Sequence, residues 1–271
     1  MKTPAELLSE SRKIVIKLGS NTISGEDGKV DRNIMRHIVG QIMELIDQGK
    51  HVVVVSSGAS VCGVSAINKW ARKNDMNYKQ ALCAIGQVEL MNAYKEFFGE
   101  YGLHVGQMLL TGDDFHEPHR EINIRNALFT LVDEGVVPII NENDSVSIDE
   151  FRIGDNDTLS ALVANLWAAD LLILMSDIDG VYDRDPHSDP EAELIEYVDN
   201  IEKLREDIDT EGKSEFGTGG IVTKLNAAEM VNEYGTAMLL VNSRKEDILG
   251  RLAQGEEKAT VFVRNAERQG H

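Results

Sequence analysis

The stretch HVVVVSSG, residues 51–58, places four consecutive valines ahead of two serines and a glycine. A strand with one face in water alternates polar and apolar residues. A continuous apolar run instead predicts a strand buried on both faces, as in a parallel sheet covered by helices. The stretches KIVIKLG (13–19) and DLLILMSD (170–177) have the same character. Together the three stretches favour an α/β fold with a mainly parallel sheet.

Helix-like apolar periodicity separates these strands along the chain. We expect helices over residues 31–48, 59–69, 78–98, 120–134, 157–168 and 223–234, and further strands over 136–141, 237–242 and 259–263. The alternation of strand and helix predicts an α/β sandwich. The acidic stretch 199–215 is the nearest approach to a linker, and it could instead be a mobile flap over a site.

The composition narrows the classes of function. The 271 residues are 42% apolar and 27% charged, as in a globular protein, and their net charge of −19 disfavours nucleic acids and anionic membranes as partners. No apolar run approaches the roughly 20 residues that span a bilayer, and the N-terminal stretch lacks the apolar segment of a secretory signal. We therefore expect a cytoplasmic protein whose two cysteines, Cys62 and Cys83, are reduced thiols.

Small or polar residues follow the predicted strands at their carboxyl ends. These residues are Ser57 and Gly58, Asn141 and Asp144, and Ser176 and Asp177. In doubly wound sheets, ligands bind beyond the carboxyl ends of the strands. Any one of these residues could be a turn residue or a helix cap, but their recurrence after successive strands favours a shared ligand site.

Two lysines stand where an unpaired ammonium group is unfavourable. Lys17 lies among apolar β-branched residues, so it either meets an anion or reaches water along an apolar surface. Lys224 follows GTGGIVT (217–223) near the start of a predicted helix, where the helix dipole disfavours a cation. That stretch is neither a Walker A loop nor a G-x-G-x-x-G fingerprint, yet glycines ahead of a helix suit a phosphate. Both lysines therefore indicate an anionic ligand.

Asp155, Asn156 and Asp157 crowd the start of one predicted helix. One such residue would suffice as an N-cap, and capping alone is the simpler alternative. We expect Asn156 to contact a ligand and Asp157 to hold the two lysines. A carboxylate between ammonium groups fixes their geometry and keeps them charged.

On these residues the chain resembles the amino-acid kinase superfamily and, within it, the glutamate 5-kinase branch. The motifs that carry the resemblance are IVIKLGS (14–20), VVVVSSGA (52–59), GLHVGQMLLT (102–111), VPIINENDSVS (137–147), GDNDTLSALVA (154–164), LLILMSDIDGVYDRDP (171–186) and GTGGIVTKLNAA (217–228). They run in the order in which the family has them.

The resemblance implies a three-layer α/β/α sandwich around a mainly parallel, eight-stranded sheet, in a single kinase domain. The acceptor would bind to a lobe of about residues 13–150 and ATP to a lobe of about residues 151–263. Many members carry a C-terminal PUA domain, which this chain is expected to lack. Assembly as a homo-oligomer (a dimer or tetramer) and feedback inhibition by L-proline are further implied properties, which this departure leaves open.

The resemblance also implies a role for each matching residue. Lys17 and Lys224 match the lysines that neutralise the transferring phosphoryl group, and Asp157 matches the aspartate that organises them. The expected glutamate contacts are Ser57, Asp144 and Asn156, with Asn141, Asp155 and Gly58 beside them. The expected nucleotide contacts are Lys17, Ser176, Asp177, Thr218, Gly219, Gly220, Ile221, Val222, Thr223 and Lys224.

The implied reaction transfers a phosphoryl group from ATP to the side-chain carboxylate of L-glutamate, the first step of proline biosynthesis. This carboxylate is ionised at neutral pH, so no general base is required. We expect Mg²⁺ to be held mainly through the ATP phosphates and not by a set of protein ligands. The alternatives are a sister kinase that acts on N-acetylglutamate, aspartate, carbamate or UMP, and a non-catalytic nucleotide-binding sensor on the same fold.

Overall fold

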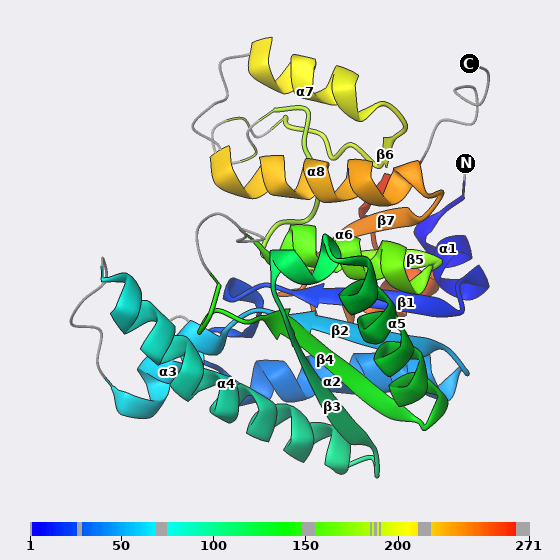
Figure 1. The fold of residues 1–271 in the computed structure, drawn as a ribbon. Helices are drawn as coiled ribbons and strands as arrows, with labels where there is room; N and C mark the ends of the chain where they lie inside the picture. Colours follow the sequence, from blue (N-terminus) through cyan, green and yellow to red (C-terminus); the bar gives the residue numbers. More distant parts are fainter. Residues whose placement is uncertain are drawn as a thin grey trace.

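An eight-stranded sheet runs through the middle of the molecule (Figure 1). The computed structural model of the chain describes residues 2–25, 29–68, 75–147, 155–184, 186, 189, 191–210 and 218–263. The strands are β1 (Lys13–Leu18), β2 (His51–Ser56), β3 (His104–Leu110), β4 (Val136–Glu142), β5 (Leu171–Ser176), β6 (Tyr197–Val198), β7 (Ala237–Asn242) and β8 (Thr260–Phe262).

The order of the strands across the sheet is β3-β4-β2-β1-β5-β7-β8-β6. The six strands from β3 to β7 in this order are parallel to one another, β8 is antiparallel to β7, and β6 is parallel to β8. The predicted mainly parallel, eight-stranded sheet is therefore confirmed.

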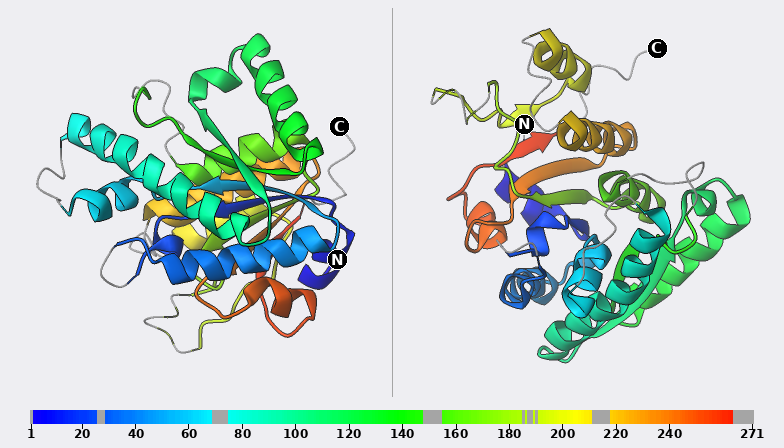
Figure 2. Two further views of the ribbon diagram at one scale, coloured as in Figure 1. Left: turned by 90° about the horizontal axis from the view of Figure 1, so that it is seen from below. Right: turned by 90° about the vertical axis from the view of Figure 1, so that its left-hand side faces the viewer.

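Helices cover both faces of the sheet (Figures 1 and 2). One core lies between the sheet and α1 (Pro4–Glu10), α2 (Arg32–Asp47), α3 (Ala59–Ile67), α4 (Met76–Gly99) and α9 (Ile248–Ala253). The other core lies between the sheet and α5 (Pro118–Asp133), α6 (Asn156–Trp167), α7 (Ile201–Thr210) and α8 (Thr218–Glu233). Two short 3₁₀ turns, η1 (Asn21–Ile23) and η2 (Gly112–Phe115), follow β1 and β3.

The alternation of side chains along β1 explains where Lys17 points. Ile14, Ile16 and Leu18 belong to the core under α2, whereas Val15 belongs to the core under α6 and α8. Successive side chains of a strand point to opposite faces of the sheet. Lys17, two residues after Val15, therefore lies on the face that α6 and α8 cover.

Five elements were not predicted: α1, β3, β6, α7 and α9. Strand β3, His104–Leu110, lies at the sheet edge, and most of its side chains are only partly buried, so its sequence lacks a continuous apolar run. The linker interpretation of residues 199–215 is wrong for Ile201–Thr210, which form α7 and bury Ile201 and Leu204. The alternative, a flap over the site, stays a prediction. Residues 211–215 lie outside the described residues.

The start of α8 also differs from the prediction. The helix was expected from residue 223, after a glycine loop, but Thr218, Gly219 and Gly220 already belong to it. Glycine is a poor helix former, which is why its presence predicts a loop. Here the packing of α8 against α6 outweighs that preference, because most helical stability comes from tertiary contact of a buried face.

Neither cysteine forms a disulfide, as predicted. Burial raises the pKa of the Cys62 thiol to about 12. Within the described ranges, no helix combines the length and the apolar character that crossing a membrane requires.

Candidate active site

The candidate site lies where the strand order reverses. Strand β1 lies between β2 and β5, with Lys17 paired in register with Val55 on one side and Leu174 on the other. The chain passes from β1 to β2 in one direction and reaches β5 later in the other. Such a switch point opens a crevice at the carboxyl ends of the strands.

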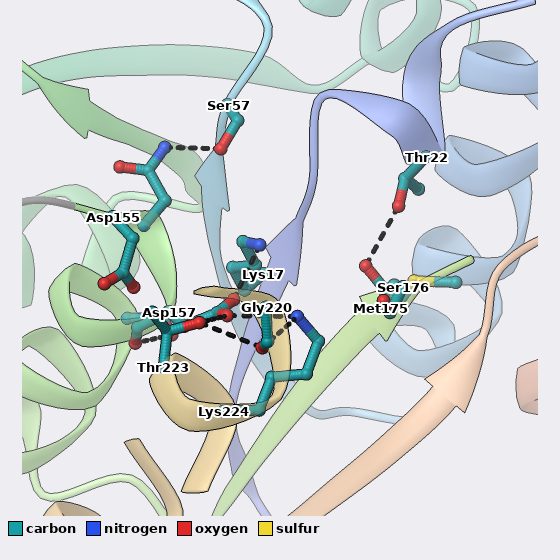
Figure 3. Close-up of polar contacts among 12 residues, drawn as sticks. Lys17, Thr22, Ser57, Asp155, Asp157, Met175, Ser176, Gly220, Thr223 and Lys224 are labelled. Carbon is teal, nitrogen blue, oxygen red and sulfur yellow. Dashed lines mark hydrogen bonds and ion pairs between the residues drawn. The ribbon is translucent and has the colours of Figure 1, made fainter. Parts of the chain in front are cut away.

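A buried carboxylate joins two lysines at this point (Figure 3). Nζ of Lys17 lies 2.6 Å from Oδ1 of Asp157, and Nζ of Lys224 lies 3.2 Å from Oδ2. The Thr223 hydroxyl donates a hydrogen bond of 2.9 Å to Asp157 Oδ2, and Lys224 Nζ donates one of 3.2 Å to the Gly220 carbonyl. The expectation that Asp157 holds both lysines matches this geometry.

Three separate elements bring these charges together. Lys17 is the fifth of the six residues of β1, Asp157 is the second residue of α6, and Lys224 is the seventh residue of α8. The sequence predicted Lys224 in the first turn of its helix. In the structure the helix begins earlier, so Lys224 lies in the second turn. Asp157 is free for the lysines because Asp155 is the N-cap, accepting a hydrogen bond of 2.8 Å from the Thr158 backbone.

The charges in this cluster are uneven. Burial favours a raised pKa for Asp157, but the charges of Lys17 and Lys224 and the hydrogen bonds from Lys17 and Thr223 lower that pKa below its ordinary value. The carboxylate is therefore ionised at neutral pH and balances only one of the two ammonium groups. The lysine side chains keep 12% and 11% of their surface exposed, so an anion from solvent can reach them.

Polar side chains at the ends of β2 and β4 form a second group beside the triad of Lys17, Asp157 and Lys224. Nδ2 of Asn156 donates hydrogen bonds of 2.8 Å to Ser57 Oγ and 2.9 Å to Asn141 Oδ1. Nδ2 of Asn141 in turn donates one of 2.9 Å to Oε1 of Gln87, on α4. Three of the predicted acceptor-side residues therefore lie in one network. Gln87 was missed because a single amide in a helical apolar stripe gives no pattern to detect.

Gly58, between β2 and α3, has a backbone that requires glycine. Its φ is +105°, and a Cβ there would lie 2.2 Å from Cδ1 of Ile23. Left-handed backbone is open to glycine without steric cost. The turn lets the chain leave β2 sharply, so that Ser57 faces the crevice and α3 starts directly behind it.

The ends of β5 and β7 form a third group, on the other side of β1. Asn21 Nδ2 donates a hydrogen bond of 3.0 Å to Asp177 Oδ2, and the Ser243 hydroxyl donates one of 2.8 Å to the Ser176 carbonyl. Burial favours a raised pKa for Asp177, but hydrogen bonds, the one from Asn21 foremost, lower it. Arg244, which was not predicted, donates hydrogen bonds to the carbonyls of Asn21 and Ser24.

The side chains of the remaining predicted residues take no part in these groups, although the Gly220 carbonyl accepts from Lys224. Asp144 is half-buried in the turn after β4, three residues past Asn141. The carboxylate of Asp155 is occupied as a helix cap. Thr218, Gly219, Gly220, Ile221 and Val222 belong to the first turns of α8.

Comparison with known proteins shows the family of the chain. Residues 12–242 match the amino acid kinase family. The chain belongs to this family. Two relatives named glutamate 5-kinase are similar over nearly their whole lengths. The one from Alkaliphilus metalliredigens (strain QYMF) is 59% identical over 95% of this chain and 97% of its own. The one from Alkaliphilus oremlandii (strain OhILAs) is 54% identical over 96% and 98%.

Solved structures give the same fold at low sequence identity. Carbamate kinase from Giardia lamblia bound to AMP-PNP is 15% identical, covers 95% of this chain and 100% of its own, and superposes with a TM-score of 0.67. At that identity the likeness concerns the fold alone. The predicted amino-acid kinase fold is therefore confirmed.

Proposed function

We propose that this chain transfers the γ-phosphoryl group of ATP to the side-chain carboxylate of L-glutamate, giving γ-glutamyl phosphate and ADP, the first step of proline biosynthesis. The relatives at 59% and 54% identity that carry the name glutamate 5-kinase support this acceptor. The observation that carries the proposal is the shared carboxylate of Asp157, which holds Lys17 and Lys224 at 2.6 and 3.2 Å.

The chemistry needs charge neutralisation more than proton transfer. The glutamate side chain has a pKa of about 4.3, so the acceptor oxygen is already an anion at neutral pH. It must approach a phosphoryl group that is also anionic, to about 3–3.5 Å along the reaction line. Lys17 and Lys224 exceed Asp157 by one positive charge, which favours the charge distribution that develops on the transferring group.

The two sides of β1 suit different substrates. We assign glutamate to the network of Ser57, Asn141 and Asn156, with Gly58, Asp144 and Asp155 close by in the chain. We assign ATP to the ends of β5 and β7 and to the first turns of α8, Thr218 to Lys224, with Ser176 and Asp177 on the nucleoside side. The division between the lobes then falls at about residue 150.

The donor set suits a nucleotide that brings its own metal ion. Both oxygens of Asp157 are engaged by lysines, and no group of three or more potential metal-binding side chains occurs among the described residues. Mg²⁺ commonly binds through phosphates and water with few protein ligands, which fits this set. When bound, it would neutralise part of the phosphate charge.

An acceptor panel tests the proposal. ADP release is measured with ATP and, in turn, L-glutamate, N-acetylglutamate, L-aspartate, carbamate and UMP. We expect the highest kcat/KM with L-glutamate. A higher value with another acceptor would make the chain a sister kinase, and nucleotide binding without turnover on any acceptor would make it a sensor.

Assembly as a homo-oligomer and inhibition by L-proline belong to the same proposal. Both rest on the family likeness. Light scattering of the purified chain measures its assembly, and the glutamate assay repeated with L-proline measures the inhibition.

A further inference from the structure

Helix α4 buries two polar side chains against the ends of the strands that form the acceptor side. Gln87 is only 8% exposed and accepts the hydrogen bond of 2.9 Å from Asn141, at the end of β4. Tyr94, two turns later, shares a hydrogen bond of 2.7 Å with Ser56, the last residue of β2. One helix face therefore contacts the residues beside and beneath Ser57 and Asn156.

A chain of hydrogen bonds runs from Gln87 through Asn141 and Asn156 to Ser57, and each bond has a defined donor and acceptor. Oε1 of Gln87 accepts from Asn141 Nδ2, and Oδ1 of Asn141 accepts from Asn156 Nδ2 and from the Glu142 backbone N–H, each at 2.9 Å. Asn156 then donates through Nδ2 to both Asn141 Oδ1 and Ser57 Oγ. A primary amide has two N–H donors, so those of Asn156 are both used.

This direction determines what the site offers a ligand. Ser57 Oγ accepts from Asn156, which leaves its O–H as a donor. Within the described part of the chain, no hydrogen bond uses that O–H or Oδ1 of Asn156. A donor and an acceptor side by side suit an amino acid, whose carboxylates accept and whose ammonium group donates.

Close packing holds Gln87 in place. A Cβ on the neighbouring Gly86 would lie 1.7 Å from the Ala59 carbonyl oxygen, so α4 lies against the start of α3 more closely than any other residue at 86 would allow. Ala59 follows Ser57 and Gly58 directly. The position of Gln87 and the turn that carries Ser57 are therefore coupled through backbone contact.

We propose that Gln87 is a positioning residue for the acceptor: by accepting from Asn141 it acts with the Glu142 backbone N–H to fix the direction of the Asn141–Asn156–Ser57 relay, and so the binding of L-glutamate. The proposal rests on the proposed function. Without the acceptor oxygen of Gln87, the buried Nδ2 of Asn141 loses its partner, and only the Glu142 backbone N–H then holds Oδ1 of Asn141 toward Asn156. Such a loss is comparable to an unsatisfied buried hydrogen-bonding group.

The test compares Gln87→Met with Gln41→Met. Gln41, on α2, is 3% exposed, accepts one hydrogen bond through Oε1 from the Leu249 backbone, and has an Nε2 without a partner among the described residues, as Gln87 does. The two substitutions therefore make the same chemical change at buried positions of similar exposure, 8% for Gln87 and 3% for Gln41. Kinetic constants for glutamate and ATP, and the melting temperature, are measured for both variants.

We expect Gln87→Met to raise the glutamate KM about tenfold or more, with kcat and the ATP KM within about threefold of wild type. Gln41→Met should lower the melting temperature comparably and leave the glutamate KM unchanged. In an Asn141→Ala background, Gln87→Met should add no further change in glutamate KM, because both act through one relay.

The results that would contradict the proposed function differ from those that would contradict only the role of Gln87. Absence of glutamate turnover in the wild type would overturn the proposed function and this inference with it. Normal wild-type turnover with an unchanged glutamate KM in Gln87→Met, an equal rise in Gln41→Met, or additive effects with Asn141→Ala would overturn the inference alone. If Gln87→Met is not recovered folded, Gln87→Leu removes the same acceptor oxygen and carries the same expectations.

Discussion

The ammonium groups of Lys17 and Lys224 meet at the two oxygens of one carboxylate, that of Asp157. The two lysines come from the first strand and from a helix near the other end of the sequence. Two like charges this close repel each other unless an anion lies between them. One carboxylate leaves an excess positive charge at the edge of the crevice, and this excess underlies the proposed phosphoryl transfer.

Replacing Lys224 by alanine should lower kcat by roughly 10²-fold or more and change the glutamate KM little, because the lysine acts mainly on charge that develops in the transition state. The control is Lys258→Ala, which removes an exposed lysine paired with Glu196. It should behave as wild type in a coupled ADP-release assay. Near-normal turnover of Lys224→Ala would contradict a role for Lys224 in the phosphoryl transfer.

Asp157→Asn should change how stability depends on pH. The pKa of Asp157 is lowered in the folded state, so the stabilisation from its ionised form is complete above the unfolded pKa of about 3.9 and is lost as pH falls through the lower folded pKa. The difference in free energy of unfolding between wild type and variant should be constant from about pH 5 to about pH 8 and shrink below about pH 4. Urea unfolding at several pH values measures it. A difference that varies across the neutral range would contradict an ionised Asp157.

Asp144→Ala should mainly impair glutamate binding. Asp144 lies three residues past Asn141, in the turn on the acceptor side. We expect the glutamate KM to rise, with a much smaller change in the ATP KM. If glutamate saturation were unchanged and ATP binding weakened, the division of the site into acceptor and nucleotide sides would be wrong.

Lys50→Met should destabilise the fold without affecting catalysis. Nζ of Lys50 is buried and donates hydrogen bonds to the carbonyls of Leu8, Ser9 and Ser11, at 2.5, 3.2 and 2.9 Å, at the end of α1. Losing these bonds should lower the free energy of unfolding by about 2 kcal/mol. Kinetic constants should not change, because Lys50 lies at the amino end of β2, opposite the site. A changed kcat would show that α1 communicates with the crevice.

The apolar strands and the chemistry at their ends could be read from the sequence. A continuous apolar run such as that of β2 fits few structures other than a strand buried on both faces. A single lysine in such a run, Lys17, indicated an anionic ligand. Local pattern therefore indicates the central strands and the candidate residues Lys17, Asp157 and Lys224, whereas the fold brings these three residues into contact.

Other features depend on tertiary contacts that local pattern does not contain. The edge strand β3 is only partly buried, and Gly219 and Gly220 are helical against their own preference. Gln87 acts only because Gly86 lets α4 approach α3 so closely. A helical stripe cannot distinguish such an amide from an ordinary core position.

The most direct test of the account is to trap the product. An acyl phosphate reacts with hydroxylamine to give a hydroxamate and inorganic phosphate. We therefore expect the wild-type chain to form the side-chain hydroxamate of L-glutamate, in amounts that match ADP and only when ATP and glutamate are both present. ADP release without hydroxamate, or a larger hydroxamate yield with N-acetylglutamate or L-aspartate, would contradict transfer to the glutamate side chain.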